Sequence, residues 1–296
     1  MVDARRGGHP TPMSDTKSMM KLVEYLDDDN NLTNKGINKL TGYIAEAKDL
    51  VDQMRCQEMI SFATSAVRDA RNSDHVLDHV AKQTGIRLEI LSGEDEARLT
   101  FLAVRRWFGW SAGRIVNLDI GGGSLELTSG TDEDPDAAYS LLLGAGRLTH
   151  EWFDTDPPDR KKIDLLRDYI DAELVEPARH LRTLGEPDLA VATSKTFRTL
   201  ARLTGAAPST AGPRVKRTLT APGLRQLIAF ISRMTAADRA ELEGVSSNRS
   251  HQIVAGALVA EASMRALGLD QLQRCPWALR EGVILRRLDS DLYGKG

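Results

Sequence analysis

The chain has 296 residues, 41% of them hydrophobic, with a formal net charge of −3 from 39 basic and 42 acidic residues. This composition is typical of a soluble globular protein with one large or two ordinary domains. The charge balance argues against a surface coated in positive charge for nucleic-acid binding, and no apolar run reaches membrane-spanning length. Cys56 and Cys275 are too few for a disulfide framework, so a reducing cytoplasm is the default location.

Hydrophobic spacing predicts helices and strands in alternation along the first third of the chain. Ile37, Leu40 and Ile44 recur at helical spacing and predict a helix over 36–55. Short apolar or alternating segments predict strands over 59–64 and 86–91, with a helix over 73–83 between them. Residues 92–109 open with a Ser-Gly turn followed by acidic residues, which favour the start of a helix.

The same reading extends to the rest of the chain. It predicts strands over 114–120, 125–130 and 138–144, helices over 147–153 and 159–182, a strand over 188–194 and a helix over 195–203. Residues 206–216 are the most loop-like stretch, and the remainder is predicted to be mainly helical, over 221–234, 249–267 and 278–288. Because strands and helices mix throughout, the predicted class is α/β or α+β with two lobes.

The segment Asp119-Ile120-Gly121-Gly122-Gly123-Ser124 carries the strongest chemical signal. Three glycines permit a tight turn and leave backbone N–H groups uncovered, which suits phosphate oxygens. Asp119 at the strand end can hold a hydrated Mg²⁺, and Ser124 can add a hydroxyl donor. No lysine follows and no helix starts, which excludes a Walker A loop and a dinucleotide fingerprint. The alternative is a glycine-rich hairpin turn, which needs fewer than three glycines.

Three adjacent carboxylates, Glu94, Asp95 and Glu96, stand at a predicted helix start. A carboxylate beside a phosphate chain can orient and deprotonate a water for in-line attack. Taken alone, such a cluster more often balances the helix dipole on the surface. Arg68, after a buried strand, can anchor a phosphate, although the residue type alone favours an ordinary surface arginine.

Several basic residues are candidates to line a path for a polyanion. Arg214, Lys216 and Arg217, at the end of the loop-like stretch, can line such a path, and an ordinary solvated loop is an equally good interpretation of them. With two further cations the predicted set is Lys195, Arg214, Lys216, Arg217 and Arg249. A negatively charged chain can still bind a polyanion when its basic groups gather in one channel.

These segments resemble the exopolyphosphatase/guanosine pentaphosphate phosphohydrolase (Ppx/GppA) family of the actin–Hsp70–sugar-kinase superfamily. The resemblance runs nearly end to end. It rests on TSAVRDARN (64–72), ILSGEDEARLTFLAV (90–104), NLDIGGGSLEL (117–127), LLLGAGRLT (141–149) and ALREGVILRRL (278–288). It implies an α/β fold of two ribonuclease-H-like lobes with an interlobe active-site cleft. The lobes are expected over 1–97 plus 283–296 and over 98–282, in the short form without a C-terminal HD-type domain.

The resemblance also implies roles for single residues. The family's catalytic carboxylate stands immediately before Ala-Arg, which is Glu96 here. Its second-loop acid and the acid after the glycines match Asp119 and Glu126, near which Mg²⁺ is expected. Arg68 matches a phosphate-contacting arginine. The segment ATSKTFRTLA (192–201) stands where ATP-dependent members carry an adenosine-binding loop, and it suits a phosphate chain better than a purine.

The implied activity is release of terminal phosphate from inorganic polyphosphate by Mg-assisted water attack, with no nucleic-acid or membrane partner and a homodimer as one assembly to test. The alternatives are a guanosine pentaphosphate phosphohydrolase and a catalytically impaired polyphosphate- or nucleotide-binding protein. The impaired protein is an alternative because family members begin with a strand followed by a DxGSN-type phosphate loop. The first residues here, MVDARRGG, resemble only the end of that strand. The first lobe is therefore expected to be N-terminally incomplete. An ATP-driven kinase or chaperone is disfavoured, since no acceptor-site motif is visible.

Overall fold

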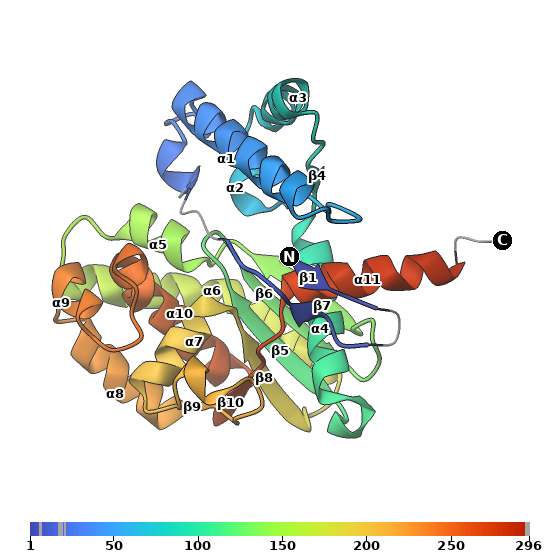
Figure 1. Cartoon of the computed structure of the whole chain (residues 1–296). Coiled ribbons are helices and arrows are strands. Elements are labelled where there is room, and N and C mark those ends of the chain that lie inside the picture. The colour runs from blue at the N-terminus through green and yellow to red at the C-terminus, as the bar shows by residue number, and fades with distance from the viewer. Residues whose placement is uncertain (6–7, 17–19, 21, 294–296) are drawn as a thin grey trace. The chain divides into compact units, whose positions relative to one another are not determined.

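The computed structural model describes residues 1–5, 8–16, 20 and 22–293, and the chain forms two compact units (Figure 1). One unit comprises Met1–Asp95 with Leu288–Gly296, and the other comprises Glu96–Arg287. The sequence predicts that the chain passes from one lobe to the other after residue 97 and returns after residue 282. The structure places these two passages within two helices, α4 (Gly93–Phe108) and α11 (Leu279–Tyr293).

The first unit is built around two helices, α1 (Asn34–Gln53) and α3 (Ser73–Thr84). Both follow the predicted ranges, and their buried apolar stripes join in one core. Thr33 caps α1 by accepting a hydrogen bond from the Gly36 N–H, and α3 ends at Gly85 with φ 72°. The other elements are β1 (Val2–Asp3), β2 (Thr11–Pro12), η1 (Leu22–Tyr25), β3 (Phe62–Ala63), α2 (Ser65–Arg68) and β4 (Glu89–Ile90).

Two strands of this unit are shorter than predicted. β3 and β4 pair only with each other among the described residues, in parallel over two residues each. Each strand therefore has a hydrogen-bonded neighbour on one side only. The other residues of the predicted strands 59–64 and 86–91 lie outside the sheet.

The second unit is built on a six-stranded sheet with the order β7-β6-β5-β8-β10-β9. Its strands are β5 (Ile115–Ile120), β6 (Leu125–Gly130), β7 (Ala137–Leu141), β8 (Leu189–Thr193), β9 (Thr218–Thr220) and β10 (Gln271–Arg274). β5, β6 and β7 are antiparallel neighbours, and β8 runs parallel to β5 and β10. This is the ribonuclease-H-like arrangement that the resemblance implies, and it confirms the α/β class. β9 and β10 lie beside and between the ranges predicted to be helical, where the sequence predicts no strand.

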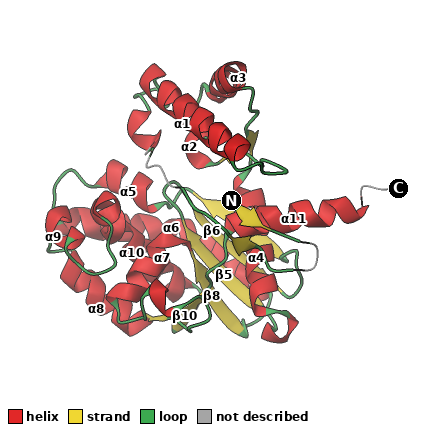
Figure 2. Ribbon diagram, in the orientation of Figure 1, coloured by secondary structure: helices red, strands yellow, loops and turns green. Residues whose placement is uncertain are grey.

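Helices cover both faces of this sheet (Figure 2). One face packs against α5 (Ala145–Trp152), α6 (Arg160–Thr183), α7 (Ser194–Leu203), α8 (Ala221–Ile231) and α10 (Ile253–Ala266). The other packs against α4 and α11. β5 serves both cores because its side chains alternate, with Leu118 and Ile120 in the first and Ile115 in the second. The remaining elements are η2 (Trp110–Ala112), η3 (Ser209–Ala211), α9 (Ala236–Ala240) and η4 (Ser247–Gln252).

Helix α4 is fixed to the second unit by a buried arginine and by a close helix crossing. The Arg105 guanidinium, 1% exposed, donates hydrogen bonds to the carbonyl oxygens of Gly113 at 2.7 Å and Gly130 at 3.0 Å. A Cβ added at Gly282 of α11 would overlap the Leu99 carbonyl, so this crossing requires glycine. These contacts hold the start of α4, which carries Glu96, in a defined place on the sheet.

The aromatic cluster at the end of α4 is only partly buried. Trp107 packs edge-on against Trp277 with ring centroids 5.4 Å apart, and both belong to the core under α4. Trp110, by contrast, is 62% exposed. No helix in the described part of the chain has the length and apolar character needed to cross a membrane.

Candidate active site

Four polar side chains form one row across four adjacent strands of the second unit. Strand register pairs Glu126 with Ser140 on β7 and with Asp119 on β5, and Asp119 with Thr193 on β8. Directly paired residues project from the same face of a sheet, so all four lie on one face. Ser140 Oγ donates a hydrogen bond to Glu126 Oε1 at 3.0 Å, and Thr193 Oγ1 donates to Asp119 Oδ2 at 2.6 Å. Each carboxylate is thus oriented by a hydroxyl on its outer side.

The two carboxylates in this row are electrostatically uncompensated. Burial raises the pKa of Asp119 to about 6, and the hydrogen bond from Thr193 limits the rise. Burial raises the pKa of Glu126 to about 8, with further contributions from the negative charges of Asp119 and Glu96. Hydrogen bonds from Ser124 and Ser140 oppose this rise only in part. Acids with pKa values raised in this way are characteristic of functional sites.

Glu96 is the only member of the acidic cluster at 94–96 that adjoins this row. It lies in the first turn of α4 and is half-buried, whereas Glu94 and Asp95 are exposed. Its charge raises the pKa of Glu126, so the two carboxylates lie close enough to repel. Asp95 instead accepts a hydrogen bond from the Ser92 hydroxyl at 2.6 Å, at the start of the helix. The structure therefore pairs Asp119 with Glu126 and places Glu96 within electrostatic range of Glu126.

The three glycines form the hairpin between β5 and β6, as the strand–turn–strand prediction requires. The Gly121 N–H closes the turn on the Ser124 carbonyl at 2.9 Å. The first turn of α5 binds the other side of the loop: Ala145 N–H donates to the Gly121 carbonyl at 3.0 Å, and two further N–H groups donate to Gly122. Helix-terminal N–H groups lack partners within their own helix, and here they find them in the loop.

This anchoring leaves a set of backbone donors open. Among the described residues, the backbone N–H groups of Gly122, Gly123 and Ser124 donate no hydrogen bond. Consecutive unpaired N–H groups form a concave site for anions. The loop lies at the end of β5 next to Asp119 and leads into Glu126 two residues after Ser124. The hairpin therefore presents a cradle for phosphate oxygens beside the carboxylate row.

A second row of polar groups lies behind the first on the same face. Asn117 on β5 pairs with Thr128 on β6, two residues behind Asp119 and Glu126. Asn117 is 1% exposed and Thr128 is fully buried. Within the described residues, neither Asn117 Oδ1 nor Thr128 Oγ1 has a hydrogen-bond partner.

Asp119 and Glu126 fit a hydrated Mg²⁺ ion. No group of three or more His, Cys, Asp or Glu side chains in the described residues is arranged to hold a metal ion. Mg²⁺ does not require such a group, because it keeps several waters and binds through one or two carboxylates together with substrate phosphates. Two buried carboxylates that repel each other are stabilised by a divalent cation, and they supply the oxygen ligands that Mg²⁺ prefers.

The raised pKa values predict how the stability of the metal-free protein depends on pH. Glu126 has a pKa of about 8 in the folded chain and of about 4.3 when unfolded. A group with a raised folded pKa stabilises fully below its unfolded pKa, and this stability is lost as pH rises through the folded pKa. We expect Glu126→Gln to gain stability relative to the unsubstituted chain between pH 5 and 8.5, as urea unfolding in chelator would measure. Parallel pH profiles for the two proteins would contradict this expectation.

The predicted cationic residues lie in different places. Lys195 is half-buried in the first turn of α7, and Arg249 is half-buried in η4. Arg214 and Lys216 are exposed on the loop before β9. Arg217 is 4% exposed, and its guanidinium donates to four loop carbonyls, those of Ala207, Pro208, Gly212 and Val215. Its donors hold the loop together, so Arg217 is not available to a polyanion.

Arg68 belongs to the first unit and has local partners there. It ends α2, with Nε 2.9 Å from Asp69 Oδ1, and Nη1 donates to the Leu91 carbonyl at 3.1 Å. The side chain is 17% exposed, so it is held against its own unit. Its assignment as a phosphate contact stays a prediction.

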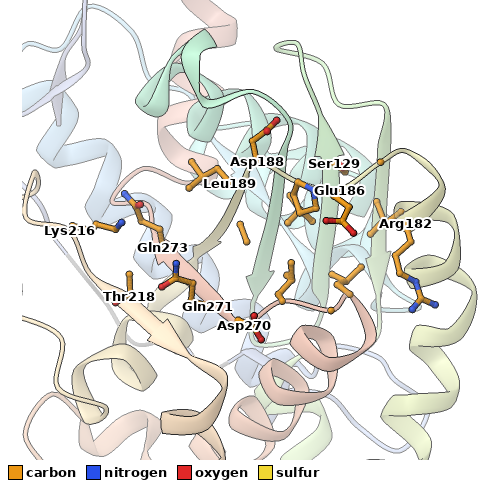
Figure 3. Close-up of a pocket in the computed structure, with 18 residues that line it drawn as sticks. Ser129, Arg182, Glu186, Asp188, Leu189, Lys216, Thr218, Asp270, Gln271 and Gln273 are labelled. Carbon is orange, nitrogen blue, oxygen red and sulfur yellow. The ribbon is translucent and has the colours of Figure 1, made fainter.

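A cavity in the second unit lies away from the carboxylate row. It measures about 580 Å³ and is lined by residues at the start of β8, on β9 and β10 and at the ends of α6 and α10. In Figure 3, Lys216, Thr218, Gln271 and Gln273 lie on one side of it, and Ser129, Arg182 and Glu186 on the other. It reaches β8 at Leu189, whereas Thr193 ends that strand. This cavity is therefore separate from the candidate active site.

The chain is similar to named proteins over nearly its whole length. The chain is 66% identical over 294 residues to Exopolyphosphatase 1 of Mycobacterium tuberculosis, covering 99% of this chain and 86% of that protein. It is 64% identical over 294 residues to Exopolyphosphatase 1 of Mycobacterium leprae, covering 99% and 87%.

Solved structures show the same fold. An exopolyphosphatase from Cytophaga hutchinsonii matches with a TM-score of 0.87 at 22% identity, covering 98% of this chain and 93% of that one. A Ppx/GppA family member from Aquifex aeolicus matches with a TM-score of 0.80, also at 22% identity and with the same coverage. The model of the Ppx/GppA phosphatase family matches residues 1–291, and the chain belongs to that family.

Proposed function

We propose that this protein is an exopolyphosphatase, a hydrolase that releases the terminal phosphate of inorganic polyphosphate. The family and the names of the mycobacterial relatives support this activity. The observation that carries it is the open row of N–H groups from Gly122 to Ser124, next to the paired carboxylates Asp119 and Glu126, with Glu96 within electrostatic range of Glu126. Anion donors and a carboxylate base side by side are what hydrolysis of a phosphoanhydride requires.

In the proposed reaction, a water oxygen attacks the terminal phosphorus while the bridging P–O bond breaks, and the shortened chain leaves. Glu96 orients the water and accepts its proton. The N–H groups of Gly122, Gly123 and Ser124 hold the oxygens of the transferred phosphoryl group, where negative charge must be stabilised. Thr193 and Ser140 keep the Asp119 and Glu126 carboxylates in position through the hydrogen bonds described above.

Asp119 and Glu126 are the residues that we propose to hold Mg²⁺. When bound, the ion would neutralise the phosphate charge and orient the chain. The two cysteines are free, which agrees with the reducing cytoplasm that we propose as the location.

We also propose that Lys195 and Arg249 line a path for the polyphosphate chain, and that this path makes binding depend on salt. Each cation that neutralises a phosphate releases bound counter-ions, so log affinity falls linearly with log salt concentration. We expect the KM for long polyphosphate to rise at least tenfold between 50 and 200 mM salt, as phosphate release at varied salt would measure. An unchanged KM over this range would contradict a path lined with cations.

A phosphate-release assay tests the proposed activity. Inorganic polyphosphate, guanosine pentaphosphate and ATP are compared in the presence of Mg²⁺, with Asp119→Asn as a control for contaminating phosphatases. We expect polyphosphate to give the highest kcat/KM. A higher value for guanosine pentaphosphate would favour the alternative phosphohydrolase. Polyphosphate binding without release would indicate the impaired binding protein.

A further inference from the structure

Three arginines from three elements lie close together without counter-charges. Arg198 lies on α7, Arg249 on η4 and Arg274 at the end of β10. No carboxylate in the described part of the chain forms an ion pair with any of them, whereas Arg202, four residues after Arg198, pairs with Glu243. Burial lowers the pKa of Arg249 and of Arg274, and repulsion from Arg198 lowers both further. The positive charge at this place is therefore uncompensated.

Arg274 also carries an unsatisfied donor. Its Nε is buried and donates no hydrogen bond within the described residues. A buried charged donor without a partner destabilises the fold, because it loses its hydration and gains nothing in return. Arg217, directly before β9, is the cross-strand neighbour whose carbonyl accepts the Arg274 backbone N–H at 2.9 Å. It shows the contrast, since its own guanidinium donates to four carbonyl oxygens. An anion at Arg274 would supply the missing acceptor.

The cluster borders the glycine loop. Helix α7, which carries Arg198, begins beside the loop, because the Thr196 hydroxyl donates to the Ile120 carbonyl at 3.0 Å. Arg198 itself is exposed and lies on the other side of this helix from Thr196. In η4, Gln252 Oε1 lies 2.8 Å from where a Cβ on Gly146 would stand, and that Cβ would lie 3.1 Å from the Gly122 carbonyl. Gln252 follows Arg249 by three residues, so the two share a face of this 3-10 helix.

Strand register places the third arginine at the same edge of the sheet. Arg274 pairs with Ala192, the residue before Thr193, and Thr193 pairs with Asp119. Arg274 thus lies two strands from Asp119, about 10 Å across the sheet. Because Ala192 pairs with Leu118, the Arg274 side chain projects from the face opposite to that of Asp119, which is the face that α7 covers. Lys195 and Arg198 stand three residues apart on one face of α7. Cations therefore extend outward from the loop that would hold the terminal phosphate.

We propose that Arg198 and Arg274, beside Arg249, form a second anion subsite that binds an internal phosphate of the polyphosphate chain. This inference rests on the proposed function, since the glycine loop must hold the terminal phosphate. The subsite makes the protein favour long chains over pyrophosphate, which is too short to reach from the loop to both arginines. Arginine suits the role because its planar fork of donors matches phosphate geometry.

The test compares Arg198→Gln and Arg274→Gln with Arg225→Gln, an exposed arginine on α8 that serves as the charge-matched control. We expect each subsite variant to raise the KM for long polyphosphate about tenfold with little change in kcat. The KM for pyrophosphate should not change. The salt slope of polyphosphate affinity should become shallower by about one for each variant, and the control should match the unsubstituted protein.

A binding measurement separates this inference from the proposed activity. Long polyphosphate is titrated into metal-free protein and its protection against heat unfolding is recorded, so that hydrolysis is not needed. Weaker protection in Arg198→Gln supports the subsite even if no phosphate is released. Unchanged protection, KM and salt slope in this exposed variant would overturn the inference even if polyphosphate is hydrolysed. Arg274→Lys, which keeps the charge, controls for a folding defect at the half-buried position and should retain more affinity than Arg274→Gln.

Discussion

Glu96→Gln is expected to lower kcat for phosphate release by about 10²–10⁴-fold, the usual effect of removing a general base. The substitution keeps the size of a half-buried side chain in the first turn of α4 and removes its ability to accept a proton. It also removes one of the negative charges that repel Glu126, so the fold should be retained. Steady-state phosphate release, together with circular dichroism and thermal unfolding, measures both expectations.

Glu94→Gln is the matched control. Glu94 lies in the same turn of the same helix but is exposed. Its loss should leave kcat near that of the unsubstituted protein. Equal losses of activity in the two variants would attribute the effect to the helix start in general. A Glu96→Gln protein with near-full activity would show that another group accepts the proton.

Gly144→Ala is expected to disrupt the phosphate cradle. A Cβ at this position would overlap backbone atoms of Gly123 and Ser124, and neither the loop nor the start of α5 can yield without breaking the hydrogen bonds between them. Displacing donors that stabilise developing charge costs about 10²–10³-fold in kcat. Phosphate release and protection by orthophosphate against heat unfolding should both fall.

Gly42→Ala serves as the control for this substitution. Gly42 lies within α1, and an added Cβ there has no atom within 4 Å. Because alanine favours helix over glycine by about 1 kcal/mol, this variant should be at least as stable as the unsubstituted protein and fully active. Unchanged kcat in Gly144→Ala would mean that the loop can shift without losing its donors.

The central hairpin of the site is predictable because its signal is local. Three glycines between two apolar strands, with no helix signal after them, predict a turn with open N–H groups, and the structure has that hairpin. The distinction between Glu96 and its acidic neighbours is not local. The three residues differ in exposure only because α4 packs on the sheet with one face.

Ser140 and Thr193 were beyond prediction as partners of the carboxylates. Each lies on a different strand, and the contact depends on the register across four strands. A strand that slips by one residue turns its side chains to the other face, so single-residue accuracy in register would be needed. The nearest signal in the sequence is a hydroxyl residue at the end of a predicted strand, as at Thr193.

β9 and β10 were missed because they are short and lie among helical segments. With β10 missed, Arg274 could not be placed at the carboxyl edge of the sheet, nor grouped with Arg198 on α7. Arg217 illustrates the opposite case. Its position in a basic run predicts a cation in solvent, but a loop rich in glycine and proline leaves carbonyls without partners, and the guanidinium satisfies them.

The second polar row behind the carboxylates lowers the stability of this enzyme. The unsatisfied oxygens of Asn117 and Thr128 each destabilise the fold by on the order of 1–3 kcal/mol. They stand in the middle of the central strands, where apolar residues would pack as well. Proteins commonly accept lower stability beside a reactive centre, since polarity there serves the chemistry. Apolar substitutions at these two positions are therefore expected to raise the stability of the protein and to lower its catalytic rate.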